Sequence, residues 1–118
     1  MHIPELVAHR GYALHYPENT LIGIEAAIRA GARYVEVDVQ LSADKVPVLF
    51  HDRTLDRLCR VEGTIHRYTR EELKAFHVFE FERFGYKFAQ NPITTLAELG
   101  ALLARHPQVT AFIELKRI

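Results

Sequence analysis

The fold of this chain is decided by residues 34–41, which read YVEVDVQL. In a β-strand, successive side chains point to opposite faces, so the alternation in this stretch separates apolar from polar positions. One face carries Val35, Val37 and Val39, and the other carries Glu36, Asp38 and Gln40. Because the valine face suits a covering layer of helices, the pattern predicts a strand buried on both sides within an α/β fold.

Glu36 and Asp38 place two carboxylates on the polar face of this strand. Burying an unpaired carboxylate is unfavourable, so we expect a cation beside them. A hard divalent cation such as Mg²⁺ or Ca²⁺, which prefers oxygen ligands, is the simplest choice. The last β-rich run repeats the pattern, with Glu114 as a candidate third ligand and Lys116 as a phosphate partner or a balancing charge. The alternative interpretation is a solvated acidic face and a surface Glu–Lys pair.

The composition is that of one globular domain. The chain has 118 residues, of which 48% are hydrophobic and 25% charged, enough for one core and too few for two. Lys and Arg number 15, as do Asp and Glu, which gives no electrostatic argument for a nucleic acid partner. There is no apolar run of the roughly 18 residues that a membrane helix needs, and no signal-peptide pattern. We therefore expect a cytoplasmic protein without a transmembrane segment.

Strand and helix signals alternate along the chain. Runs rich in β-forming residues predict strands at 6–8, 34–41, 46–50 and 109–115. Capping residues predict helices that start after Asn19 or Thr20, after Thr69 and after Thr95. Residues 76–88 contain five phenylalanines without a clear period, and we interpret these rings as core. The alternation favours parallel strands joined by right-handed crossovers, in a barrel or an open sheet.

Two of the seven histidines stand at the ends of predicted strands. His9 closes the first strand and precedes Arg10, and His51 closes the run at 46–50. In parallel α/β folds, active sites gather at the carboxyl ends of the strands. Two imidazoles that flank a phosphodiester act as general base and general acid, and an adjacent arginine offers a planar fork to phosphate oxygens. The alternative for each histidine is a packed, hydrogen-bonded side chain.

Taken in order, these residues resemble the signature of the glycerophosphodiester phosphodiesterases. The matching stretches are His9-Arg10-Gly11, Pro17-Glu18-Asn19-Thr20, Glu36-Val37-Asp38, Pro47-Val48-Leu49-Phe50-His51-Asp52, Thr54-Leu55-Asp56-Arg57 and Glu114-Leu115-Lys116. Any one stretch is weakly specific, but the ordered set is highly specific and spans nearly the whole chain.

The resemblance implies a (β/α)8 barrel, of which residues 1–118 cover about the first three strands, with an insertion at about 54–93 after the second. It implies acid-base catalysis by His9 and His51, and phosphate binding by Arg10 with Lys116 nearby. It further implies one divalent cation, Mg²⁺ or Ca²⁺, bound by Glu36, Asp38 and Glu114. The implied reaction is metal-dependent hydrolysis of a small-molecule glycerophosphodiester to sn-glycerol 3-phosphate and an alcohol, with water or a neighbouring substrate hydroxyl as the first nucleophile.

Two other readings of the same residues stay open. One is a lysophospholipase D-type phosphodiesterase of the same superfamily, favoured if the phenylalanines of 76–88 form an apolar face at the barrel mouth. The other is an inactive truncated fragment that retains the motif. Three barrel strands alone would have unpaired edges and exposed apolar surface. We therefore expect a longer chain, and self-association through strand edges if the chain ends at Ile118.

Overall fold

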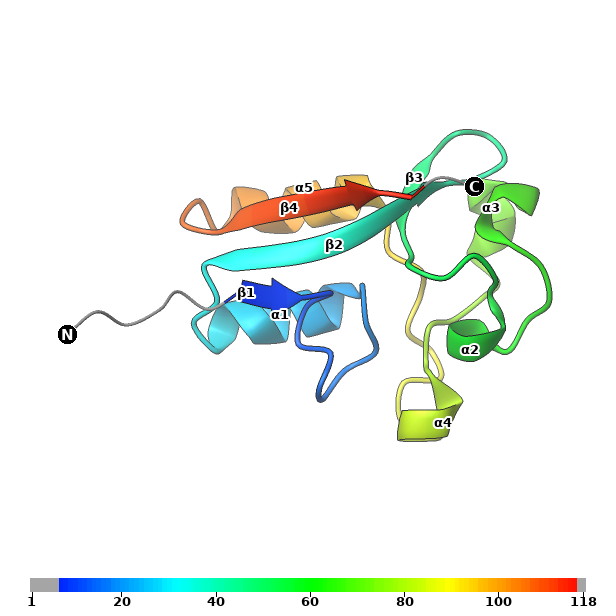
Figure 1. Cartoon of the computed structure of the whole chain (residues 1–118), viewed down its shortest axis with the longest axis horizontal. Coiled ribbons are helices and arrows are strands. Elements are labelled where there is room, and N and C mark those ends of the chain that lie inside the picture. Colours follow the sequence, from blue (N-terminus) through cyan, green and yellow to red (C-terminus); the bar gives the residue numbers. More distant parts are fainter. Residues whose placement is uncertain (1–6, 117–118) are drawn as a thin grey trace.

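The computed structural model describes residues 7–116. Its sheet is built on β2 (Tyr34–Leu41), which pairs in parallel with β1 (Val7–His9) and β4 (Thr110–Leu115) and antiparallel with β3 (Pro47–Leu49). Figure 1 shows β2 as the long strand between β1 and β4. The predicted parallel pairing of the first, second and last strands is confirmed. The predicted strand start at Leu6 and the chain end at Ile118 lie outside the described residues.

The strands β1 and β3 share one edge of β2. Alternate carbonyls of a strand point to opposite edges. On one edge, Glu36 O accepts from Arg10 N at 2.7 Å and Asp38 O accepts from Phe50 N at 2.9 Å. On the other edge, Val39 O accepts from Lys116 N at 2.9 Å, next to β4. The chain segments that follow β1 and β3 therefore approach the same edge of β2.

The strand before His51 is antiparallel to β2, a direction that the sequence pattern did not predict. After the turn at residues 42–45 the chain folds back, so that β3 pairs with the end of β2 in antiparallel register, with Leu49 opposite Val39. A short connection permits this hairpin, whereas a parallel return would need a crossover of a dozen or more residues. The hairpin nevertheless directs the chain beyond Phe50 towards the loop after β1.

The helix starts follow the predicted capping residues. In α1 (Leu21–Arg29), the Thr20 hydroxyl accepts from Gly23 N at 3.2 Å. Capping boxes start α3 (Arg70–Leu73) at Thr69 and α5 (Leu96–Ala104) at Thr95. Each threonine accepts from a backbone amide three residues later, and the glutamate there accepts from the threonine amide.

The first core lies between the valine face of β2 and the helices α1 and α5. Both helices lie behind the sheet in the view of Figure 1. The buried residues of this core are Ile24, Val35, Val37, Val39, Leu49, Leu99, Leu102 and Val109. The valine face is therefore covered by helices, as predicted, and the polar face of β2 points to the opposite side of the sheet.

A second core holds the segment between β3 and α5, which the sequence predicts as an insertion. This segment contains α2 (Asp56–Cys59), the 3₁₀ turn η1 (Ile65–Arg67), α3 and α4 (Phe81–Phe84). Its buried residues are Val48, Phe50, Leu55, Leu58, Cys59, Ile65, Leu73, Val78 and Ile93. Cys59 is a buried residue of this core, and its burial raises the pKa of the thiol to about 12.

The interpretation of the phenylalanines of 76–88 as core is wrong for most of the rings. Phe76 packs against the second core, but α4 has no buried residue. Cations cover three of the rings instead, with Arg60 over Phe81, Arg83 over Phe84 and Lys87 over Phe88. A cation that lies over an aromatic face is attracted to the ring and shields it partly from water. Phe81, Phe84 and Phe88 therefore form an aromatic surface layer, half-buried beneath these cations.

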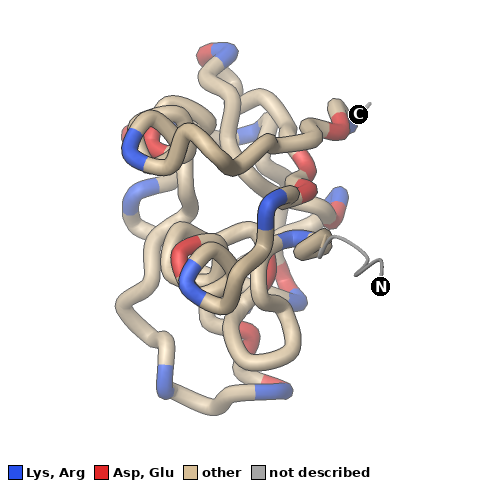
Figure 2. Tube along the Cα trace, turned by 90° about the vertical axis from the view of Figure 1, so that its left-hand side faces the viewer, with Lys and Arg blue, Asp and Glu red and all other residues tan. Residues whose placement is uncertain are grey.

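Within residues 7–116, no helix is both long enough and apolar enough to cross a membrane. Acidic and basic positions are interspersed along the trace in Figure 2.

On β4, Phe112, Ile113 and Leu115 are exposed. The sheet has the parallel strands and crossover helices of consecutive β/α units.

We predict that Thr95→Ala lowers the free energy of unfolding of the intact protein by about 1 kcal/mol, because the N-terminal amides of α5 lose their cap. Chemical denaturation measures this change. Thr110→Ala, an exposed position at the start of β4, is the control and should shift stability by less than about 0.5 kcal/mol. Equal effects of the two changes would contradict a capping role.

Candidate active site

The three predicted carboxylate ligands meet on the polar face of the sheet. The register places Glu36 beside His9 of β1 and Asp38 beside Glu114 of β4. One ligand oxygen from each of Glu36, Asp38 and Glu114 lies within 4.8 Å of the others. Side chains at facing register positions are near neighbours, so the alternation along β2 and β4 produces this cluster directly.

The cluster has the properties of a site for a hard cation. Asp38 is 1% exposed, and Asp38 Oδ1 and both carboxylate oxygens of Glu36 accept no hydrogen bond from the described residues. Their nearest cationic neighbours are Lys116 Nζ, 3.6 Å from Asp38 Oδ1, and the ring of His9, whose Nε2 lies 3.0 Å from Glu36 Oε2. Burial, the negative charge of Asp38 and, to a smaller extent, that of Glu114 raise the pKa of Glu36, against the lowering effects of His9 and Arg10. Buried oxygens without donors are what Mg²⁺ or Ca²⁺ binds. The residues present therefore fit a divalent cation.

Asp38 also contacts cationic and amide groups from two segments, the loop after β1 and the end of β4. Its Oδ2 lies 3.1 Å from Arg10 Nε and accepts from Asn19 Nδ2 at 3.1 Å, and its Oδ1 lies 3.6 Å from Lys116 Nζ. Asn19 Oδ1 accepts from the Asp38 backbone amide at 3.1 Å, so the Asn19 side chain forms hydrogen bonds with both the backbone and the carboxylate of Asp38. These contacts orient the carboxylate that is most deeply buried.

The loop after β1 takes a conformation that brings its side chains to the sheet. Arg10 and Asn19 both have left-handed backbone angles, with φ of 58° and 56°, which non-glycine residues rarely adopt. Gly11 has φ of 83°, and a Cβ at this position would lie 3.0 Å from Ile24 N. Glycine is therefore required where the loop crosses α1.

Arg10 and Lys116, the predicted phosphate partners, are each bound to two carboxylates. Arg10 pairs with Asp38 and, at 3.4 Å, with Glu18, whereas Lys116 pairs with Asp38 and, at 3.4 Å, with Glu114. Both side chains are partly buried, with 23% and 24% exposure. Positive charge thus lies on both sides of the carboxylate cluster.

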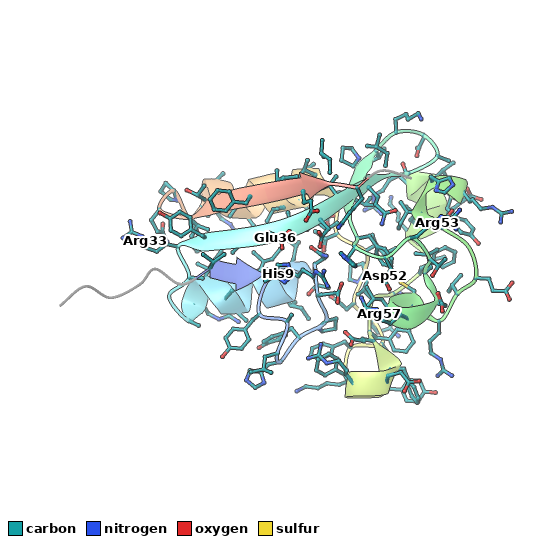
Figure 3. The ribbon with its side chains drawn as sticks, viewed as in Figure 1. His9, Arg33, Glu36, Asp52, Arg53 and Arg57 are labelled. Atoms are coloured by element: carbon teal, nitrogen blue, oxygen red, sulfur yellow. The ribbon has the colours of Figure 1, made fainter. Side chains whose placement is uncertain are left out.

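The two predicted catalytic histidines differ in their surroundings. His9 is 66% exposed, and its Nε2 lies 3.0 Å from Glu36 Oε2. His51 is 33% exposed, and its Nδ1 lies 2.9 Å from Asp52 Oδ1. When Nδ1 donates to Asp52, Nε2 carries the ring lone pair. Figure 3 shows His9 beside Glu36 at the end of β1, with Asp52 and Arg57 across from them towards α2.

Arg57 forms the centre of a second charged group. Its Nε and Nη2 donate to the two oxygens of Asp52 at 2.8 and 3.0 Å, and its Nη2 also lies 3.0 Å from Glu18 Oε1. These hydrogen bonds lower the pKa of Asp52 below its usual range. Glu18, His51 and Asp52 have the spacing of a metal site, but Arg57 forms ion pairs with both of these carboxylates.

Sequence reasoning missed the roles of Glu18, Asn19, Asp52 and Arg57, which it quoted only as parts of motifs. The sequence shows that these four residues lie near His9 and His51 along the chain. Their position in the sequence does not show which of them contact one another in the fold. Gln40, the third polar residue of the β2 face, donates to Phe50 O at 3.0 Å and Asp52 O at 2.6 Å. It therefore fixes the chain around His51 and is not part of the carboxylate cluster.

Comparisons with known proteins identify the family. Residues 9–118 match the model of the glycerophosphoryl diester phosphodiesterase family. A glycerophosphodiester phosphodiesterase of Caldanaerobacter subterraneus is 40% identical over 83% of this chain and 40% of its own length. The human glycerophosphodiester phosphodiesterase 1 is 36% identical over 93% of this chain and 33% of its own. The chain thus spans less than half the length of these relatives.

Solved structures agree with this match. An Oleispira antarctica phosphodiesterase in complex with the product sn-glycerol-3-phosphate aligns with a TM-score of 0.86 and 35% identity, over 97% of this chain and 45% of that chain. A Thermotoga maritima glycerophosphodiester phosphodiesterase aligns with a TM-score of 0.78 and 35% identity, over 99% and 46%. The predicted fold class, the N-terminal part of a (β/α)8 barrel, is confirmed. The chain belongs to the glycerophosphoryl diester phosphodiesterase family.

Proposed function

We propose that the intact protein hydrolyses glycerophosphodiesters to sn-glycerol 3-phosphate and an alcohol. The observation that carries this proposal is the cluster of Glu36, Asp38 and Glu114, which has buried oxygens without donors and lies beside two cations and His9. Family membership and the product-bound relative support a glycerophosphodiester as the small-molecule substrate. The activity is proposed for the intact protein because this chain spans under half of its relatives.

Glu36, Asp38 and Glu114 would hold one Mg²⁺ or Ca²⁺. When bound, this cation would polarise a phosphoryl oxygen of the substrate and neutralise the negative charge that develops on the phosphate. Oxygen-only ligands of this kind suit a hard cation. Arg10 and Lys116 add donors for phosphate oxygens at the border of the cluster. Their ion pairs with Asp38 keep these long side chains near the cluster before substrate binds.

His9 and His51 are the proposed acid-base pair. One imidazole accepts the proton of the nucleophile, and the other donates a proton to the leaving alkoxide. Asp52 favours this role of His51, because an Nδ1–H group that donates to Asp52 leaves the ring lone pair on Nε2, where it can accept a proton. The exposure of His9 leaves its ring accessible to a bound substrate.

A lysophospholipase D-type activity is the second candidate, and one observation favours it. Tyr86 and Leu14 are 71% and 74% exposed, and Tyr86 stacks on the half-buried ring of Phe79, while Phe88 packs against Tyr16 of the loop after β1. Arg83 joins the aromatic surface layer to the loop after β1 by donating to Leu14 O at 3.0 Å. An acyl chain would find apolar contacts there. Faster turnover of lysophosphatidylcholine than of glycerophosphocholine would identify this activity.

We predict that Glu36→Gln and Asp38→Asn each strongly reduce the affinity of the intact protein for Mg²⁺ or Ca²⁺, because each change removes a charged oxygen ligand. Isothermal calorimetry measures the affinity. Glu25→Gln, on the outward part of α1, is a control that should leave it unchanged. Wild-type affinity in both ligand variants would exclude the proposed metal site.

Loss of either imidazole should slow the reaction. We expect His9→Ala and His51→Ala to lower kcat for glycerophosphocholine by about 10²- to 10⁴-fold, the usual contribution of a general acid or base. Arg10→Lys should also reduce turnover, because a point charge replaces a planar fork. His106→Ala, at the end of α5, is the matched control. Near-normal turnover in His51→Ala would contradict its catalytic role.

A further inference from the structure

A buried carboxylate lies in the segment between β3 and α5, away from the proposed metal ligands. Glu80 is 4% exposed, and its backbone has φ of 45° and ψ of 68°, in the left-handed region. Such a conformation is unfavourable for a residue with a Cβ and persists where the surroundings fix it. Glu80 N donates to Leu58 O at 3.0 Å, which joins the residue to the end of α2.

Each oxygen of Glu80 faces an arginine. Oε1 lies 3.4 Å from Arg83 Nη1, and Oε2 lies 3.8 Å from Arg57 Nη1. Burial raises the pKa of Glu80, whereas the two guanidinium groups lower it. A carboxylate is tolerated at this depth because both of its oxygens have a cationic neighbour.

A series of three contacts, through Arg57 and Asp52, joins Glu80 to His51. Arg57 Nη1 faces Glu80, Nε donates to Asp52, and Nη2 contacts both Asp52 and Glu18. Asp52 in turn lies 2.9 Å from His51 Nδ1. All three guanidinium nitrogens are thus in use, so a rotation of Arg57 would displace the carboxylate that orients the imidazole.

Through Arg83, Glu80 also reaches the loop after β1. Arg83 Nη2 donates to Ala13 O at 2.5 Å and to Leu14 O at 3.0 Å. This loop begins at Arg10 and contains Glu18, which itself contacts Arg57. Glu80 is therefore linked through Arg57 to Asp52, which follows His51, and through Arg83 to the loop that follows His9.

We propose that Glu80 is a positioning residue for His51, acting through Arg57 and Asp52. The inference rests on the proposed function, in which His51 transfers a proton. The charged groups that face His51 are Asp52 on its own loop and Glu18 from the loop after β1, both of which bind Arg57 of α2. Glu80 lies behind Arg57 and holds its third nitrogen in place. The segment from β3 to α5 thereby helps to set the geometry of proton transfer.

The test is Glu80→Gln in the intact protein, assayed on glycerophosphocholine. Glutamine keeps the size of the side chain but removes the charge that orients Arg57. We expect kcat to fall about 10- to 100-fold, the usual effect of removing a group that orients a functional residue. KM should change by less than about threefold, because substrate binding is not altered. Glu82→Gln, an exposed position in α4, is the matched control and should behave as wild type.

A double-mutant cycle separates positioning from a merely structural role. If Glu80 acts through His51, then Glu80→Gln should lower kcat by less than about twofold in the His51→Ala background. A loss as large in that background as in wild type, or wild-type kcat in Glu80→Gln, would overturn the proposal. Wild-type activity of His51→Ala itself would instead contradict the proposed function.

A second variant covers the case in which Glu80→Gln does not fold. Arg57→Lys keeps the positive charge but replaces the planar fork by a single ammonium, which cannot face Glu80, Asp52 and Glu18 in the same geometry. It should show the same fall in kcat and the same insensitivity in the His51→Ala background. Full activity of Arg57→Lys would overturn the proposal in the same way.

Discussion

The structure depends on the burial of acidic side chains on one face of β2. Asp38 is almost inaccessible to solvent and would be strongly unfavourable there without cationic and amide partners. Arg10 and Asn19 come from the loop after β1, and Lys116 comes from the end of β4. The need to neutralise this carboxylate thus explains why a strained loop and two neighbouring strands converge at one place. The same convergence creates the proposed cation site.

A second layer of ion pairs extends this arrangement away from the sheet. Glu18 contacts Arg10 on one side and Arg57 on the other, so it joins the carboxylate cluster to the group around His51. Glu80 then continues the series to Arg83 and the aromatic surface layer. Because buried charges need partners, each acidic residue requires a cation, and the alternation of signs links segments that are distant in sequence. The residues that are proposed to act in catalysis therefore also hold these segments of the fold together.

Local patterns predicted much of this molecule, and contacts between distant segments did not follow from them. The period of two in residues 34–40 placed the valines against helices and the carboxylates together, and the threonine caps located α3 and α5. Strand propensity at 46–50 does not indicate the direction of the strand, so the antiparallel pairing of β3 with β2 could not be predicted from it. The phenylalanines of 76–88 were predicted to be core residues because they are apolar. The sequence does not show that arginine and lysine side chains cover three of these rings. The assigned site roles and the cytoplasmic location stay predictions.

We propose that the divalent cation binds Glu36, Asp38 and Glu114 and not the second acidic group, Glu18 and Asp52, around Arg57. A crystal structure of the intact protein with Mn²⁺, measured at a wavelength where manganese scatters anomalously, locates the ion directly. We expect one anomalous peak between these three carboxylates, because both oxygens of Glu36 and Asp38 Oδ1 are buried and accept no hydrogen bond from the described residues, whereas Arg57 forms a short ion pair with both Glu18 and Asp52. A peak at Glu18, His51 and Asp52, with none at the first cluster, would contradict it.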